Sequence, residues 1–108
     1  MCEKEQDKIK DIVNQFYHAV KDLYPVKKII LYGSHAKGNA AADSDIDVGV
    51  VIDCPDHLQR LKITADLFHH ARKINNALEP KCIFWDEYQH HPQASILSEI
   101  IRSGIVMV

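Results

Sequence analysis

Apolar residues recur at the three- and four-residue spacing of an amphipathic helix along the first part of the chain. This stripe predicts a helix over residues 4–24, ended by Pro25, because the residue before a proline avoids the helical conformation. The members of the stripe are Ile9, Ile12, Val13, Phe16, Val20 and Leu23. The apolar run Lys28–Tyr32, bounded by Pro25 and Gly33, predicts a first strand.

The middle of the chain predicts a short helical stretch, a strand and a longer helix. Small residues over 34–42 favour one or two helical turns followed by a loop, and Asp45–Ile52 has the composition of a strand. Pro55 is suited to the first position of the next helix. We expect that helix to run to about residue 78 with its apolar stripe in the core, namely Leu58, Leu61, Ala65, Phe68, Ala71 and Leu78.

The last third of the chain predicts one more strand, a short helix and an edge strand. Pro80 ends the long helix, and Cys82–Trp85 forms the third strand, with Phe84 and Trp85 on opposite faces. Pro92 opens a helix that Gly104 closes as a C-terminal cap. The inward residues of this helix would be Ile96, Leu97, Ile100 and Ile101, and we expect Ile105–Val108 to add an edge strand.

Helices and strands therefore alternate through a single domain over residues 1–108, which predicts an α/β or α+β fold. We expect a small sheet of three to four strands covered by helices.

Charge and cysteine content narrow the function classes. The formal net charge is −2, with 13 Lys+Arg against 15 Asp+Glu, which gives little support to direct nucleic-acid binding. A local basic patch of Lys27, Lys28 and Lys37 stays open, although lysines that flank a strand are usually solvated. Three distant cysteines include no CxxC pair, and the first ten residues are charged where a secretory segment would be apolar. These features predict a cytoplasmic protein with no membrane segment.

The residues with the most chemical character are Gly33–Val48, with the sequence GSHAKGNAAADSDIDV. Because strand side chains alternate, Asp45 and Asp47 would share one face with Cβ atoms about 6 to 7 Å apart. Two such carboxylates repel each other unless a cation lies between them, and oxygen ligands suit Mg²⁺. Gly33-Ser34, between a strand and a short helix, could bind phosphate through backbone N–H groups. The alternative is a solvated polar turn before a buried strand.

Two other motifs fail at specific positions. Gly33–Gly38 has the spacing of a P-loop, but Asn39 and Ala40 stand where that loop needs Lys and Ser or Thr. An EF-hand that began at Asp43 would need glycine and glutamate at the positions of Val48 and Cys54.

Gly33-Ser34-His35-Ala36-Lys37-Gly38 followed by Ser44-Asp45-Ile46-Asp47-Val48 resembles the GSxARG…SDxDL signature of DNA polymerase β-like nucleotidyltransferases. The short chain is similar to the minimal nucleotidyltransferase group, which implies a small mixed sheet covered by helices. The resemblance implies that Gly33 and Ser34 hold phosphates, with Lys37 in place of the frequent arginine. It also implies that Asp45 and Asp47 bind Mg²⁺, with two ions in the site.

The same resemblance implies a third carboxylate from a neighbouring strand, and Glu79 is the candidate because it precedes the predicted third strand. The alternative for Glu79 is a surface charge near a helix end. His35 lies inside the motif and could contact phosphate or base.

By this resemblance the chain would be a nucleotidyltransferase that transfers a nucleoside monophosphate, with ATP or another NTP as substrate. The group implies a separate partner, a HEPN-domain toxin in many cases, for which the chain would be the antitoxin and would modify a hydroxyl. A homo- or hetero-oligomer is expected. Two alternatives stay open: a non-catalytic module that neutralises its partner by binding, and transfer to a small molecule.

Overall fold

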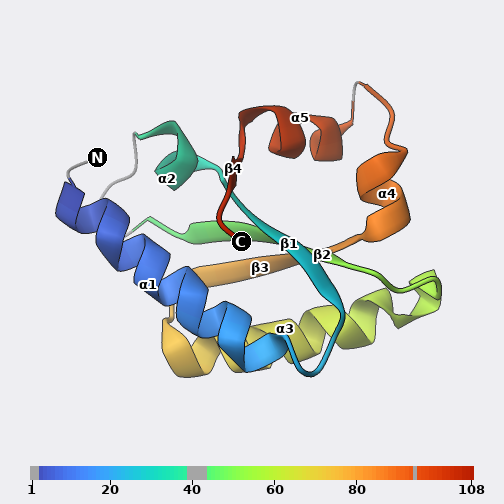
Figure 1. Ribbon diagram of the computed structural model, residues 1–108, viewed down its shortest axis with the longest axis horizontal. Helices are drawn as coiled ribbons and strands as arrows, with labels where there is room; N and C mark the ends of the chain where they lie inside the picture. Colours follow the sequence, from blue (N-terminus) through green and yellow to red (C-terminus); the bar gives the residue numbers. More distant parts are fainter. Residues whose placement is uncertain (1–2, 39–43, 94) are drawn as a thin grey trace.

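A computed structural model of the chain describes residues 3–38, 44–93 and 95–108, with side chains from Asp7 onward except that of Lys37. It contains a four-stranded sheet with helices on both faces (Figure 1). In chain order the elements are α1 (Glu3–Val20), β1 (Val26–Tyr32), α2 (Ser34–Lys37), β2 (Ile46–Ile52), η1 (His57–Gln59), α3 (Arg60–Ile74), β3 (Leu78–Phe84), α4 (Trp85–Gln89), α5 (Ile96–Ser103) and β4 (Ile105–Val106).

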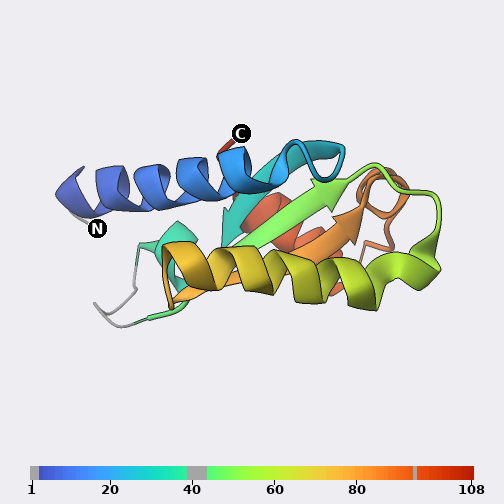
Figure 2. The ribbon, with the colours of Figure 1, turned by 90° about the horizontal axis from the view of Figure 1, so that it is seen from below.

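The sheet is mixed, as expected. Its order is β3-β2-β1-β4, with β2 and β3 parallel and both pairings of β1 antiparallel. Helices α1 and α3 pack on one face of the sheet, and α4 and α5 pack on the other. Figure 2 shows α1 and α3 running along the same face, with the strands between and behind them. Among the described residues, no helix is long and apolar enough to cross a membrane.

Strand β2 lies inside the sheet and is buried on both faces. Val48, Val50 and Ile52 point into the core beneath α1 and α3, whereas Val51 packs in the smaller cluster beneath α4 and α5. This double burial explains why the strand has a nearly continuous apolar run. Asp47 belongs to the Val51 face, because strand side chains alternate.

Helix α1 matches the predicted stripe, although it ends before Pro25. Ile9, Val13, Phe16 and Val20 are all buried, at the spacing of one helix face. The helix ends at Val20, and Lys21–Leu23 form a turn instead of a last helical turn. Leu23, predicted to be part of the stripe, is 52% exposed.

Helix α3 differs from its prediction at both ends. Pro55 does not open it: Asp56 accepts a hydrogen bond from the Leu58 N–H at 3.1 Å and caps η1, which leads into α3 at Arg60. The helix ends at Ile74, because the Asn75 side chain accepts from the Ala77 N–H at 2.8 Å and turns the chain. Leu78 therefore belongs to β3.

The buried face of α3 also differs from the predicted one. Ile63, Leu67 and Ala71 are buried, whereas Leu58 is 93% and Leu61 82% exposed, and Ala65 is exposed as well. The helix carries two apolar patterns, and the sheet covers the one that contains the β-branched Ile63. The prediction that Leu58, Leu61 and Ala65 lie in the core was wrong.

Strand β3 is longer than predicted and contains Glu79 and Pro80. Pro80 is accommodated because β3 is an outer strand, so one of its edges has no neighbouring strand to which a backbone N–H must donate. That edge is covered by α3: Arg60 donates to the Cys82 carbonyl at 2.8 Å and Arg72 to the Leu78 carbonyl at 2.9 Å. Trp85 starts α4 and does not continue the strand, because the Glu87 carboxylate accepts from the Phe84 N–H at 3.0 Å.

The C-terminal segment follows the prediction in outline. Ser95, not Pro92, caps α5 through the Ser98 N–H, and Ile96 is 77% exposed although it was predicted to be inward. Ile105–Val106 pairs with β1 as the expected edge strand. Gly104 is the C-terminal cap of α5, as predicted, and its N–H donates to the Ile100 carbonyl at 2.8 Å, but its φ of −79° is not left-handed. It is needed for close packing, because a Cβ there would lie 2.4 Å from the Ile100 carbonyl oxygen.

Stability should fall at alkaline pH through Tyr24. Its hydroxyl donates to Asp66 Oδ2 at 2.5 Å, and burial, assisted by this hydrogen bond and the Asp66 charge, raises the pKa of Tyr24 to about 12. The folded state disfavours the phenolate, so this contribution is complete below about pH 10 and is lost as the pH rises through 12. In urea unfolding measured at several pH values, Tyr24→Phe should flatten the loss of stability between pH 10 and 12. An unchanged pH slope would contradict this account.

Candidate functional site

Three polar side chains form a row across neighbouring strands on the face that also carries α4 and α5. Asp47 of β2 is in register with Tyr32 of β1 on one side and with Glu79 of β3 on the other. Register-matched residues of adjacent strands project to the same face. The structure therefore brings Asp47 and Glu79 together, as the sequence predicted, and adds Tyr32, which directly precedes Gly33 in the chain.

Gly33 lies against the Asp47 carboxylate. Its backbone has φ 76° and ψ −151°, a conformation that is essentially restricted to glycine. A Cβ at Gly33 would lie 2.6 Å from Asp47 Oδ2. The candidate phosphate-binding turn and the candidate metal-binding strand are thus in direct contact, and any side chain larger than hydrogen would separate them.

The remaining motif residues surround this contact. Ser34 is half-buried and begins α2, a single helical turn that ends at Gly38. The His35 ring is half-buried, with Nε2 3.2 Å from the Ser44 carbonyl oxygen, so it joins α2 to the chain that enters β2. Asp45 precedes β2 and is exposed. The Lys37 side chain, Asp43 and Cys2 lie outside the described part of the chain.

Negative charge is concentrated in this row. Burial raises the pKa of Asp47, the neighbouring Asp45 charge raises it further, and His35 opposes both. Burial also raises the pKa of Tyr32 to about 12, with Asp47 and Glu79 adding to the shift. Each of these shifts would be relieved by a cation beside the carboxylates. The all-oxygen donors Asp45, Asp47 and Glu79 suit Mg²⁺.

The three carboxylates are not assembled into a ready-made metal site. Among the described residues, no three His, Cys, Asp or Glu side chains are close enough to hold a metal ion together. Asp47 and Glu79 are in register, whereas Asp45 precedes β2 and is exposed.

A cavity of about 260 Å³ opens beside the row, between α3 and the free edge of β3. Its walls are formed by Tyr32, Asp47, Arg60, Thr64, Phe68, Glu79, Pro80, Lys81 and Cys82. No pattern in the sequence predicts that Thr64 and Phe68 lie beside Glu79, because only the packing of α3 against β3 brings them there. Lys81 could have been found, since it lies two residues after Glu79 on the same strand face.

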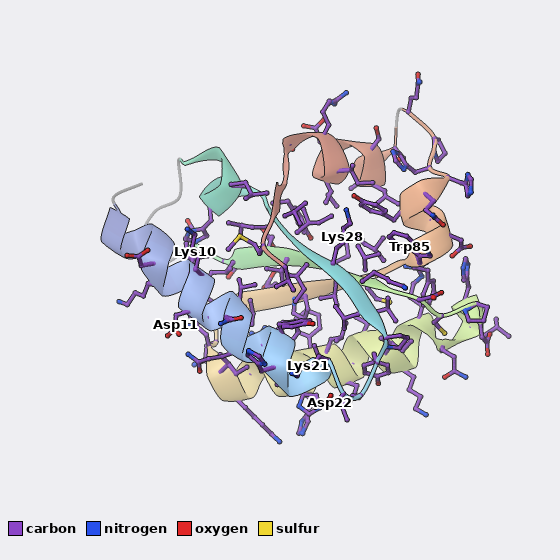
Figure 3. All side chains as sticks on the ribbon, viewed as in Figure 1. Lys10, Asp11, Lys21, Asp22, Lys28 and Trp85 are labelled. Atoms are coloured by element: carbon purple, nitrogen blue, oxygen red, sulfur yellow. The ribbon has the colours of Figure 1, made fainter. Side chains whose placement is uncertain are left out.

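Lys27 and Lys28 of the suspected basic patch are not part of this site. Lys27 Nζ is 3.9 Å from Asp53 Oδ2, and Lys28 Nζ is 5.2 Å from the centre of the Tyr88 ring. Figure 3 shows Lys28 and Trp85 beside α4, away from α2. Lys28 is half-buried over an aromatic ring and is not the solvated strand flank that was expected.

Comparison with solved structures identifies the same fold. A crystal structure described as a "putative nucleotidyltransferase from Sulfolobus solfataricus" superposes with a TM-score of 0.71 at 13% identity, over 95% of this chain and 82% of that chain. A second, "the toxin-antitoxin with AMP-PNP", gives a TM-score of 0.57 at 19% identity, over 92% and 72%. At these identities the likeness is one of fold.

Sequence comparison identifies the family. A protein of Methanocaldococcus jannaschii named "putative protein adenylyltransferase" is 42% identical over 50 residues, which are 46% of this chain and 50% of that protein. Across four such relatives the matched segments span 43 to 66% of their lengths. The model of the nucleotidyltransferase domain family matches residues 13–106, which include the whole Tyr32–Asp47–Glu79 row. The chain therefore belongs to the nucleotidyltransferase domain family.

Proposed function

We propose that the chain is a Mg²⁺-dependent nucleotidyltransferase that transfers AMP from ATP to a hydroxyl group of a protein. The observation that carries the proposal is the contact of Gly33 with Asp47, in register with Glu79, because it joins a phosphate-binding turn to a pair of carboxylates. Family membership supports the reaction type, and the names of the relatives support a protein acceptor.

We assign the residue roles from the family resemblance, together with the positions of the residues. The backbone of Gly33 and Ser34 would bind the β- and γ-phosphates, with Lys37 adding positive charge. Asp45, Asp47 and Glu79 would hold the Mg²⁺ ions, two by analogy with the family. Bound metal would supply neutralisation of the charge that develops on the phosphates.

The reaction is an in-line displacement at the α-phosphorus of ATP. The acceptor oxygen forms a bond to this phosphorus, the bond to the bridging oxygen breaks, and pyrophosphate leaves. The hydroxyl proton passes to a carboxylate, for which Glu79 is placed on the side of the cavity. The acceptor would enter through this cavity, because Gly33 and Ser34 occupy the opposite side of Asp47.

The biological role that we propose is that of an antitoxin that modifies a HEPN-domain toxin. The support is a structural neighbour described as a toxin–antitoxin with AMP-PNP, which shares this fold. Incubation with ATP labelled on the α-phosphate, Mg²⁺ and a HEPN-domain protein from the same genome tests the role. Label on the partner supports it. Inhibition of the partner without any label would favour neutralisation by binding alone.

Asp47→Asn should separate activity from stability. The pKa of Asp47 is raised by burial and by Asp45, so its charge destabilises the fold at neutral pH without metal. We expect transfer to fall by about a hundredfold or more, because electrostatic stabilisation of the transition state is lost. The thermal midpoint without Mg²⁺ should stay the same or rise, whereas the gain in midpoint on adding Mg²⁺ and ATP should disappear.

Asp53→Asn is the matched control, since Asp53 follows the opposite end of β2 and faces Lys27. It should keep both the activity and the Mg²⁺–ATP response. If Asp47→Asn retained transfer at the rate of Asp53→Asn, the assignment of Asp47 would be wrong.

Gly33→Ala and Gly38→Ala test the contact between the two halves of the site. Both glycines have positive φ, 76° and 75°, so both substitutions should cost about 1–3 kcal/mol of unfolding free energy. An added Cβ meets Asp47 at Gly33, but meets nothing within 4 Å at Gly38. ATP binding, measured by calorimetry, should therefore be lost in Gly33→Ala and kept in Gly38→Ala. Equal affinities would contradict the role of this contact.

A further inference from the structure

The two peptide groups that flank Asp45 are each held by a hydrogen bond. On the N-terminal side, the Ser44 carbonyl oxygen lies 3.2 Å from Nε2 of His35 in α2. On the C-terminal side, the Ile46 N–H donates to the Ala77 carbonyl oxygen at 2.7 Å, directly before β3. Because peptide groups are planar, only the φ and ψ angles of Asp45 lie between these two hydrogen bonds. Together they fix the point from which the Asp45 side chain projects.

Asp45 depends on these hydrogen bonds more than Asp47 does. The parallel pairing of β2 with β3 begins at Ile46 and holds Asp47 in register with Glu79. Asp45 comes before this pairing and is exposed. The sheet therefore places Asp47, whereas the flanking peptide groups place Asp45.

The hydrogen bond to Ser44 determines which nitrogen of the half-buried His35 ring carries a proton. A carbonyl oxygen only accepts, so Nε2 must be the donor. Nε2 is then engaged within the chain, and only Nδ1 remains for the contact with phosphate or base that the sequence left open. Among the side chains of α2 that the structure describes, His35 makes the one hydrogen bond to another segment.

This hydrogen bond connects the two halves of the motif, which follow different strands of the sheet. His35 comes directly after Ser34 of the candidate phosphate-binding turn, and Ser44 comes directly before the candidate metal ligand Asp45. A change at one end is therefore transmitted to the other through a single residue on each side. Ala36 packs against the larger core cluster, so α2 has a second attachment that does not involve His35.

We propose that His35 is a positioning residue that holds Asp45 beside the Gly33-Ser34 turn, so that a Mg²⁺–ATP complex meets both at once. The inference rests on the proposed function for the roles of Asp45 and of the turn. His35 itself acts through the peptide group of Ser44 and does not contact the nucleotide.

Calorimetric titration of the full chain with ATP in excess Mg²⁺ tests the inference without an acceptor. His35→Ala frees the peptide group before Asp45, so the affinity should fall by about tenfold, the loss expected when the backbone of one residue must be ordered on binding. His35→Gln should bind within about twofold of the parent chain, because the glutamine amide can donate to the same carbonyl without the charge of a protonated ring.

His91→Ala is the matched control. The His91 ring is also half-buried, and its Nδ1 lies 2.9 Å from the Tyr88 carbonyl oxygen, outside the motif and the cavity wall. This variant also loses a contact between an imidazole and a carbonyl, so its thermal midpoint should fall about as far as that of His35→Ala. Its affinity for Mg²⁺–ATP should stay that of the parent chain.

A double-mutant cycle separates positioning from direct contact with the nucleotide. If His35 acts through Asp45, His35→Ala should weaken binding in the parent chain but have little further effect in Asp45→Asn. Additive losses would overturn the proposal, because His35 would then act on the nucleotide independently of Asp45. A loss in His35→Gln as large as that in His35→Ala would overturn it too.

Backbone amide relaxation, measured by NMR on the free chain, gives a reading that needs no nucleotide. The Asp45 amide should lose order in His35→Ala and keep it in His35→Gln and His91→Ala. Unchanged order in His35→Ala would refute the positioning role whatever the affinities. If the parent chain failed to bind Mg²⁺–ATP while this amide still responded to His35→Ala, the proposed function would be refuted and the positioning of Asp45 would stand.

Discussion

The parallel pairing of β2 with β3 is the constraint on which the site depends. It places Asp47 beside Glu79 although 32 positions separate them in the sequence. A shift of one residue in this register would turn one carboxylate toward the core, because side chains alternate between faces. Buried residues on both faces of β2 and β3 oppose such a shift: Val48, Val50, Leu78 and Cys82 on one face, and Val51 and Ile83 on the other.

Acidic groups that lie close together at this end of the sheet destabilise the fold electrostatically. Asp47 and Glu79 are neighbours of the half-buried Tyr32 phenol, and Asp45 acts on Asp47; burial first, and these neighbouring charges second, raise the pKa values of Asp47 and Tyr32. A chain selected for stability alone would have little reason to gather these groups. Acidic groups with perturbed pKa values beside a cavity often mark a functional site, and here they lie within the segment that the nucleotidyltransferase family model matches.

The parts of the fold that could be predicted from sequence are those with one dominant local signal. Strands β1 and β2 have continuous apolar runs between clear boundaries, and α1 has one apolar stripe, so all three were found close to their observed limits. The Gly33-Ser34 turn and the Asp45–Asp47 pair could be recognised because each is a short motif with one dominant local signal.

The parts that could not be predicted depend on tertiary contacts. Helix α3 has two apolar faces, and only the sheet selects Ile63, Leu67 and Ala71 for burial. Strand β3 contains Pro80, and a proline argues against a strand unless that strand lies at the edge of a sheet. The edge position is known only from the structure. The positions of Thr64 and Phe68 beside Glu79 in the cavity follow from the packing of α3, and no local pattern in the sequence predicts them.

Cys82, in the wall of the cavity, has a chemical consequence for the whole site. It is 3% exposed, and burial, with Arg60 in opposition, raises the pKa of its thiol to about 11. At neutral pH only about one molecule in ten thousand would carry the reactive thiolate. Burial and the small thiolate fraction should both slow reaction of this thiol with alkylating reagents and peroxide. The carboxylate row beside it should therefore keep its chemistry under oxidising conditions that inactivate enzymes with an exposed thiolate.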